Sequence, residues 1–225
     1  MSQIQAELLK RLAEAEKVLI GIGGEWGMDC PKEELRSCRL NDPGQRSLKE
    51  AYDSLYSLVK DKDYFVVTTV TDGAVYDTLF KKERLVAPCG NIHWRQCRDA
   101  CTKDIWEEGE VADDICPHCG APLIGNTIES ENYIEEGYLI RWEAYKKWQT
   151  TTLNRRLLIL ELGEDFRTPT VMRWPFEKIV FFNQKSCLYR INESFSQVPK
   201  EIRERSAGVS ENSLLFLKNL RADRS

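Results

Sequence analysis

Hydrophobic positions along the chain alternate between helical spacing and short continuous runs. In residues 2–17, apolar side chains recur at three- and four-residue steps, at Ile4, Leu8, Leu12 and Ala15. This spacing predicts an amphipathic helix. The same reasoning predicts helices over residues 45–60, 138–150 and 213–220.

Short apolar runs separate these segments and predict buried strands. They are Val18–Ile20, Tyr64–Val70, Leu157–Leu162 and Cys187–Ile191. Apolar strands that alternate with helices predict an α/β fold, with a parallel sheet covered by helices on both faces. Ligands of such sheets bind beyond the carboxyl ends of the strands. Here those ends are Gly21–Gly24, Val70–Gly73, Gly163–Phe166 and Asn192.

Residues 89–125 are rich in Cys, Gly, Pro and charge and contain few aliphatic residues. Two close cysteine pairs stand in this segment, Cys97 with Cys101 and Cys116 with Cys119. Four thiolates in two pairs suit a tetrahedral zinc ion, and four protein ligands leave no open position for catalysis. The spacing therefore predicts a structural zinc site, against the alternative of four reduced cysteines at chance spacing. His118 is expected to be solvent-exposed and not a ligand.

Composition and charge exclude several classes of function. The chain has 225 residues, of which 42% are hydrophobic and 30% charged, as in an ordinary globular protein. Its 32 basic and 36 acidic residues give a net charge of -4, which argues against a nucleic-acid binder that relies on basic charge. The amphipathic start is not a signal peptide, and no apolar run is long enough to span a membrane. We expect a cytoplasmic protein, in which clustered cysteines indicate metal binding or catalysis.

A glycine-rich turn follows the first strand. Gly21 and Gly23 could let the backbone approach a dinucleotide pyrophosphate, or they could form a tight turn with no ligand. The full G-x-G-x-x-G pattern is absent, because Trp26 stands at the place of the last glycine. The turn alone does not decide between the two interpretations.

Two longer segments resemble a known family. The run CGNIHWRQC, Cys89–Cys97, matches the sirtuin pattern His-Gly-x-x-His-x-x-x-Cys in its spacing. Two further segments are similar to LELGxGFNTP and RxPFE of the microbial macrodomain-linked sirtuins. They are LELGEDFRTP, Leu160–Pro169, and RWPFE, Arg173–Glu177. The chain therefore resembles a sirtuin over about residues 15–192. The resemblance implies a Rossmann-type domain formed by residues 1–87 and 126–225, with a zinc-ribbon insert at 88–125.

The resemblance also implies a site and partners. It places Gly21, Gly23 and Gly163 beside bound NAD or ADP-ribose and Asn192 at the adenosine ribose. Catalytic candidates by position are Cys89, Asp72 and His93. The macrodomain-linked branch is associated with NAD-dependent ADP-ribosylation of lipoyl-carrier proteins, so a protein substrate or partner of that kind is expected.

Several positions depart from the sirtuin pattern. Cys89 replaces the His that acts as general base, and Val70 replaces an Asn of the nicotinamide side. Cys89 would act only if its pKa were lowered. His93 is a substitute base or a structural histidine beside the zinc segment. Carboxylates enter the expected phosphate region at Glu25, Glu164 and Asp165. They would favour a cation or basic peptide if they face inward, but we expect solvated loop residues.

Two functions therefore stay open. The first, which we favour, is a catalytically degenerate sirtuin that works as a binding or regulatory module. The second is a divergent NAD-dependent ADP-ribosyltransferase or deacylase with rebuilt catalytic residues, and an NAD glycohydrolase is a weaker third. The remaining cysteines, Cys30, Cys38 and Cys187, are expected to be small packing residues.

Overall fold

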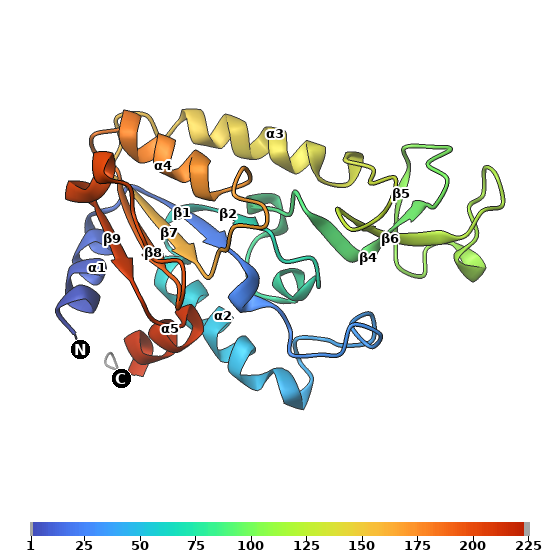
Figure 1. The fold of residues 1–225 in the computed structure, drawn as a ribbon, viewed down its shortest axis with the longest axis horizontal. Coiled ribbons are helices and arrows are strands. Elements are labelled where there is room, and N and C mark those ends of the chain that lie inside the picture. The colour runs from blue at the N-terminus through green and yellow to red at the C-terminus, as the bar shows by residue number, and fades with distance from the viewer. Residues whose placement is uncertain (1, 223–225) are drawn as a thin grey trace.

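A six-stranded parallel sheet forms the centre of the computed structural model, which describes residues 2–222 (Figure 1). Its strand order is β3-β2-β1-β7-β8-β9. The strands are β1 (Lys17–Ile22), β2 (Asp63–Thr68), β3 (Leu85–Val86), β7 (Leu157–Leu162), β8 (Cys187–Ile191) and β9 (Ser206–Val209). The order changes direction between β1 and β7, and this is the switch point at which α/β sheets bind ligands.

Helices cover both faces of this sheet (Figure 1). Helices α1 (Gln3–Glu14), α2 (Arg46–Val59) and α5 (Ser213–Ala222) pack on one face, and α3 (Glu136–Thr150) and α4 (Arg173–Phe182) pack on the other. A capping box formed by Ser2 and Gln5 begins α1. Leu8 and Leu55 belong to the first core, and Tyr145 belongs to the second. The predicted α/β fold with two covered faces is confirmed.

A smaller antiparallel sheet lies at one end of the molecule (Figure 1). Its strands are β4 (Gly90–Cys97), β5 (Ile105–Glu107) and β6 (Leu123–Thr127), with β4 in the centre. This sheet and its loops carry the four clustered cysteines. The division into a domain of residues 1–87 and 126–225 and an insert of residues 88–125 stays a prediction.

Helix α4 and strand β9 are two elements that the apolar pattern does not predict. The buried face of α4 includes the charged Arg173, whereas Phe181 and Phe182 are exposed, so its apolar pattern is blurred. Strand β9 has four residues and includes Gly208, which weakens the strand signal.

The loop between β1 and α2 differs from expectation in its cysteines. Cys30 and Cys38 form a disulfide, so the prediction of two separate packing residues is wrong. Their side chains still pack against the first core, which is why apolar burial alone was expected of them. Cys187 packs there as a free thiol, as predicted. Within residues 2–222, no helix combines the length and the apolar character that a membrane crossing needs.

Candidate functional site

The carboxyl ends of β1, β2 and β7 meet at one edge of the sheet. Backbone hydrogen bonds extend past the strand ends: Gly23 N donates to Leu162 O at 2.8 Å, and Thr69 N donates to Ile22 O at 3.0 Å. The residues that follow these strands are therefore held side by side. They include the glycine turn expected to receive a cofactor.

The three predicted cofactor glycines are all covered by the chain's own atoms. A Cβ at Gly21 would lie 2.6 Å from both Met172 Sδ and the Phe176 ring. A Cβ at Gly23 would lie 2.5 Å from Oε2 of Glu164. Gly163 has a φ of +68°, which favours glycine, and it packs against Glu25. These glycines thus allow close packing within the protein.

Glu164 occupies the space beside Gly23. Its side chain is 1% exposed, and its Oε2 accepts a hydrogen bond of 2.7 Å from Thr69 Oγ1. Its Oε1 has no hydrogen-bond partner among the described residues. Burial, together with the nearby Glu161 and Asp165, raises the pKa of this carboxyl to about 8. The expectation of a solvated Glu164 is wrong, because the missing side chain at Gly23 leaves room for the carboxyl inside.

Glu25 and Asp165 have partners within the chain. The Glu25 carboxylate accepts hydrogen bonds from Ser213 N at 2.8 Å and Ser213 Oγ at 2.6 Å, and from Glu193 N at 2.8 Å. It therefore stabilises the start of α5, where a negative charge is favourable. Asp165 accepts a 2.6 Å hydrogen bond from the exposed Arg167. Glu25 and Asp165 are both half-buried, so each retains part of the predicted solvation.

Asn192 is buried at the end of β8, with 3% of its surface exposed. Its Nδ2 donates to Glu164 O at 2.8 Å, and its Oδ1 accepts from Ser194 N and Phe195 N at 2.9 and 2.7 Å. The amide thus organises the loop that follows β8. Its role at a ribose stays a prediction.

Cys89 lies directly before β4 and is 2% exposed. Its thiol donates a long, weak hydrogen bond of 3.9 Å to Thr168 Oγ1. Burial raises the pKa of Cys89 to about 11, and nearby Glu164 also raises it. The thiol is therefore protonated at neutral pH, so the lowered pKa that a reactive Cys89 requires is not met.

Asp72 and His93 lie on the other side of the candidate site. The buried Asp72 accepts hydrogen bonds from Met28 N at 2.7 Å and Ala74 N at 2.9 Å, and burial raises its pKa. It thereby joins the loop after β1 to the turn after β2. His93 Nδ1 lies 2.9 Å from Glu108 Oε2 in the segment after β5. The side-chain partner of Cys89 is thus Thr168, and that of His93 is Glu108.

A groove of about 600 Å³ lies beside the smaller sheet and is lined by β4, β5, the start of α3 and the segment after β2. Its walls include the aromatic side chains of Tyr76, Trp94 and Trp106. Acidic residues in its wall outnumber the basic ones; they are Asp77, Glu107, Glu108, Glu110 and Glu136, against Arg39, Lys82 and Arg141. Sequence reasoning missed this groove, because its two walls come from segments far apart in the chain. His93 is the predicted site residue that lines it.

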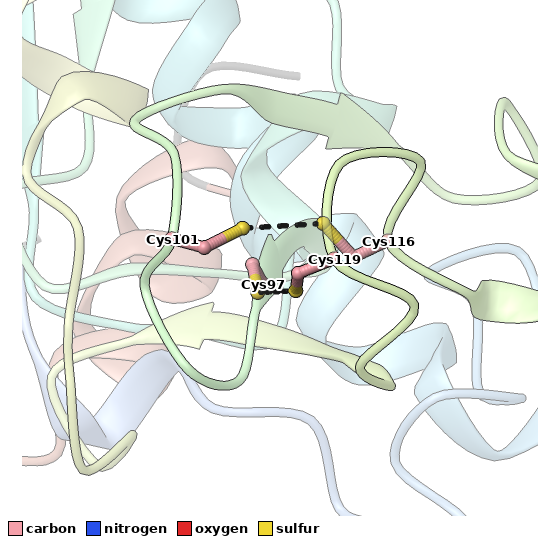
Figure 2. A group of neighbouring side chains, drawn as sticks. All are labelled: Cys97, Cys101, Cys116 and Cys119. Carbon is pink, nitrogen blue, oxygen red and sulfur yellow. Dashed lines mark hydrogen bonds between the residues drawn. The ribbon is translucent and has the colours of Figure 1, made fainter.

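The four cysteines of the smaller sheet come together (Figure 2). All four Sγ atoms lie within 4.8 Å of one another, with Cys97 to Cys119 at 3.5 Å and Cys101 to Cys116 at 3.6 Å. A tetrahedral zinc with Zn–S bonds of about 2.3 Å requires sulfur separations of about 3.8 Å. The thiols therefore fit a zinc ion. His118 stays outside the cluster, 51% exposed and 2.7 Å from Asp104.

Comparison with known proteins gives distant sequence relatives. No family model matches the chain. A protein ADP-ribosyltransferase of Staphylococcus aureus is 23% identical over 77% of this chain and 61% of its own length. A probable bifunctional ADP-ribose hydrolase/ADP-ribosyltransferase of Fusarium oxysporum f. sp. cubense is 27% identical over 68% of this chain and 30% of its own length. The matched part is thus less than two thirds of either relative.

Solved structures match over the whole chain. A sirtuin studied for its substrate affinity has a TM-score of 0.64 at 14% identity, with all of both chains covered. The chain has the sirtuin fold. A Sir2 protein bound to an acetylated peptide gives 0.64 at 12% identity, and a Sir2 complex with a p53 peptide and NAD+ gives 0.63 at 13%. These cover all of this chain and 99% of theirs, so the predicted resemblance is confirmed at the level of fold.

The residues at the glycine turn of this sirtuin fold do not suit an anionic dinucleotide in the arrangement described. The Glu164 carboxyl fills the space against Gly23, and the polar atoms of Asn192 are bonded within the chain. A carboxyl group in that place opposes an anion both by its volume and, when ionised, by its charge. Only the position of Glu164 directly after Gly163 could have indicated this from the sequence.

Proposed function

We propose that this sirtuin-fold chain is a binding or regulatory module that has lost NAD-dependent transfer. The observation that carries the proposal is the buried Glu164 carboxyl packed against Gly23, where the resemblance expects a cofactor phosphate. A phosphate group cannot share that volume with the side chain. The fold is thus retained while the space for the cofactor is filled.

The catalytic positions support the same conclusion. Transfer chemistry needs a base to activate the incoming nucleophile. Cys89, with a pKa of about 11, is a poor base or nucleophile at neutral pH. Val70 packs against the first core and has no polar group to offer. Asp72 is occupied by two backbone amides.

The acidic groove beside the smaller sheet is the proposed binding surface. Its excess of carboxylates attracts a basic protein segment, and Tyr76, Trp94 and Trp106 provide aromatic faces for Lys or Arg side chains. The solved sirtuin-fold proteins include complexes with peptides. A lipoyl-carrier protein as the partner, which the resemblance implies, stays a prediction. The cytoplasmic location and the absence of a nucleic-acid partner also stay predictions.

A structural zinc completes the proposal. Cys97, Cys101, Cys116 and Cys119 would hold the ion with all four positions occupied, so it would order the loops and leave no site for substrate. Within residues 2–222, the buried cluster around these thiols is small: Ala121 and Leu123 join Cys97 and Cys116, and the partly buried Trp106 and Val111 pack against them. We therefore expect a bound metal ion to stabilise the folded state of this sheet.

The second candidate is a divergent NAD-dependent ADP-ribosyltransferase. It is favoured by the two sequence relatives, both of which carry that activity in their names. This function requires Glu164 to leave the space beside Gly23 when the cofactor enters. It also requires a base other than protonated Cys89.

One set of measurements on the wild-type chain separates these candidates. Calorimetric titration with NAD and ADP-ribose is expected to show no binding up to millimolar ligand, and incubation with NAD should release no nicotinamide. A lysine-rich peptide should instead quench tryptophan fluorescence, because Trp94 and Trp106 line the groove. An acidic peptide of equal length is the control. Nicotinamide release above the uncatalysed rate would reject the degenerate module in favour of the transferase.

A further inference from the structure

One oxygen of a buried carboxyl has no hydrogen-bond partner in the part of the chain that the structure describes. This is Oε1 of Glu164, whose other oxygen accepts from Thr69. Buried polar atoms are nearly always paired, since an unpaired one loses its hydration without gaining a partner. An unpaired group at a sheet switch point therefore calls for an explanation based on ligand binding.

The surroundings of this carboxyl have the character of an anion site. Thr69 supplies a hydroxyl donor from the end of β2, and Gly23 permits close approach to the backbone after β1. Gly24 follows, and a Cβ there would lie 2.6 Å from the Arg167 guanidinium. A hydroxyl, a backbone without side chains and a guanidinium are groups that hold phosphate oxygens.

We propose that the Glu164 side chain is an internal plug in an anion-binding cradle formed by Gly23, Gly24, Thr69 and Arg167. The carboxyl takes the volume that a phosphate group of a ligand would fill, and it uses the Thr69 hydroxyl as that phosphate would. The inference rests on the proposed function, because it names what keeps the cofactor space closed. Removing the plug should reopen the cradle to a diphosphate ligand.

The charge state of the plug is consistent with this geometry. Five groups surround the Glu164 carboxyl. They are Thr69 directly after β2, Glu161 on β7, Asp165 and Arg167 in the loop after β7, and Cys89 before β4. Burial and the two neighbouring carboxylates outweigh the single guanidinium and the Thr69 hydrogen bond, so the pKa of Glu164 rises to about 8. A neutral carboxyl remains buried at neutral pH at far lower cost than an anion would. The plug therefore acts there through its volume.

Two substitutions of Glu164 separate volume from charge. Glu164→Ala removes the plug, whereas Glu164→Gln keeps its shape without an ionisable group. At pH 7, calorimetry with ADP-ribose should show saturable binding to Glu164→Ala, at least about tenfold tighter than to wild type, which corresponds to about 1.4 kcal/mol. Wild type and Glu164→Gln should not bind. Inorganic pyrophosphate should bind Glu164→Ala more weakly, because it offers the diphosphate alone.

Matched controls keep the test decisive. Glu129→Ala removes an exposed carboxylate in the loop after β6 and should behave as wild type. Circular dichroism and melting curves establish that each variant is folded, and Glu164→Ser replaces Glu164→Ala if the latter does not fold. A folded small-residue variant that fails to bind ADP-ribose overturns the plug. So does equal binding by Glu164→Gln, or by wild type.

The outcomes also distinguish the plug from the proposed function. Nicotinamide release by wild type contradicts the degenerate module. If wild type neither binds ADP-ribose nor releases nicotinamide, and folded Glu164→Ala still fails to bind, then the plug alone is wrong. If wild type binds ADP-ribose without releasing nicotinamide, the plug is wrong while the loss of transfer chemistry stands.

Discussion

At the residue scale, the decisive feature is a glutamate held inside the protein in its neutral form. Glu164 follows Gly163 after β7, and this position is the one local sign in the sequence that its side chain turns inward. Burial then changes its chemistry, because a carboxylate loses its hydration while only Thr69 supplies a hydrogen bond in return. The same carboxyl also raises the pKa of Cys89.

The raised pKa of Glu164 predicts a pH-dependent stability. The folded-state pKa of about 8 lies above the ordinary value of 4.5, so the protonated form favours folding. The stability this group contributes is complete below pH 4.5 and is lost as the pH rises through 8. Urea unfolding of wild type should therefore show a stability loss of a few kcal/mol across that window, compared with Glu164→Gln. Parallel profiles of the two proteins would contradict a raised pKa.

At the element scale, one buried ion pair ties two central strands together. Glu161 on β7 is in register with Arg190 on β8, and their side chains are 2.6 Å apart with 1% exposure each. Arg173 at the start of α4 also reaches Glu161, at 3.4 Å. The pair thus connects β7, β8 and α4 behind the candidate site. Sequence pattern places both residues in strands but does not show that they are partners.

Breaking this pair should be costly. Glu161→Leu leaves the buried Arg173 guanidinium without its ion-pair partner and Arg190 with Glu177 alone, and we expect a loss of about 3–5 kcal/mol in the free energy of unfolding. The exposed pair of Glu7 and Arg11 on α1 offers a control, since Glu7→Leu should cost less than about 1 kcal/mol. Urea denaturation measures both. Equal losses would show that burial of the Glu161 pair does not matter.

At the scale of the whole molecule, two sheets of different character share one chain. The large sheet is held by two apolar cores, whereas the smaller one has a cluster centred on cysteines. The groove beside the smaller sheet forms where β4, β5, the start of α3 and the loops after β2 and β5 come together. The groove therefore keeps its shape only when the smaller sheet is folded.

Zinc should provide that order. Metal analysis is expected to find about one zinc per chain, because four thiols offer a single tetrahedral site. Cys116→Ser should lose the metal and lower the melting temperature. Cys187→Ser, which changes a cysteine of the first core, should retain it. Full zinc content in Cys116→Ser, or a melting profile equal to that of wild type, would contradict a structural zinc.

Much of this architecture follows from local patterns. Strands β1, β2, β7 and β8 and helices α1, α2, α3 and α5 agree with apolar spacing to within a few residues. The cysteine spacing likewise anticipated the thiol cluster, because close pairs on tight turns need only one long-range contact to meet. Helix α4 was not anticipated, since its outward Phe181 and Phe182 hide the period.

Residue identity and local spacing are enough to predict the α/β fold, the meeting of the four cysteines and a cysteine at position 89, where the resemblance expects a histidine. The contact of Glu164 with Gly23, the Cys30–Cys38 disulfide and the groove shared by acidic residues of separate segments became visible only in the three-dimensional arrangement. These are contacts between segments far apart in the chain or between loops without a period. Which side chains meet there depends on packing, and no local pattern records it.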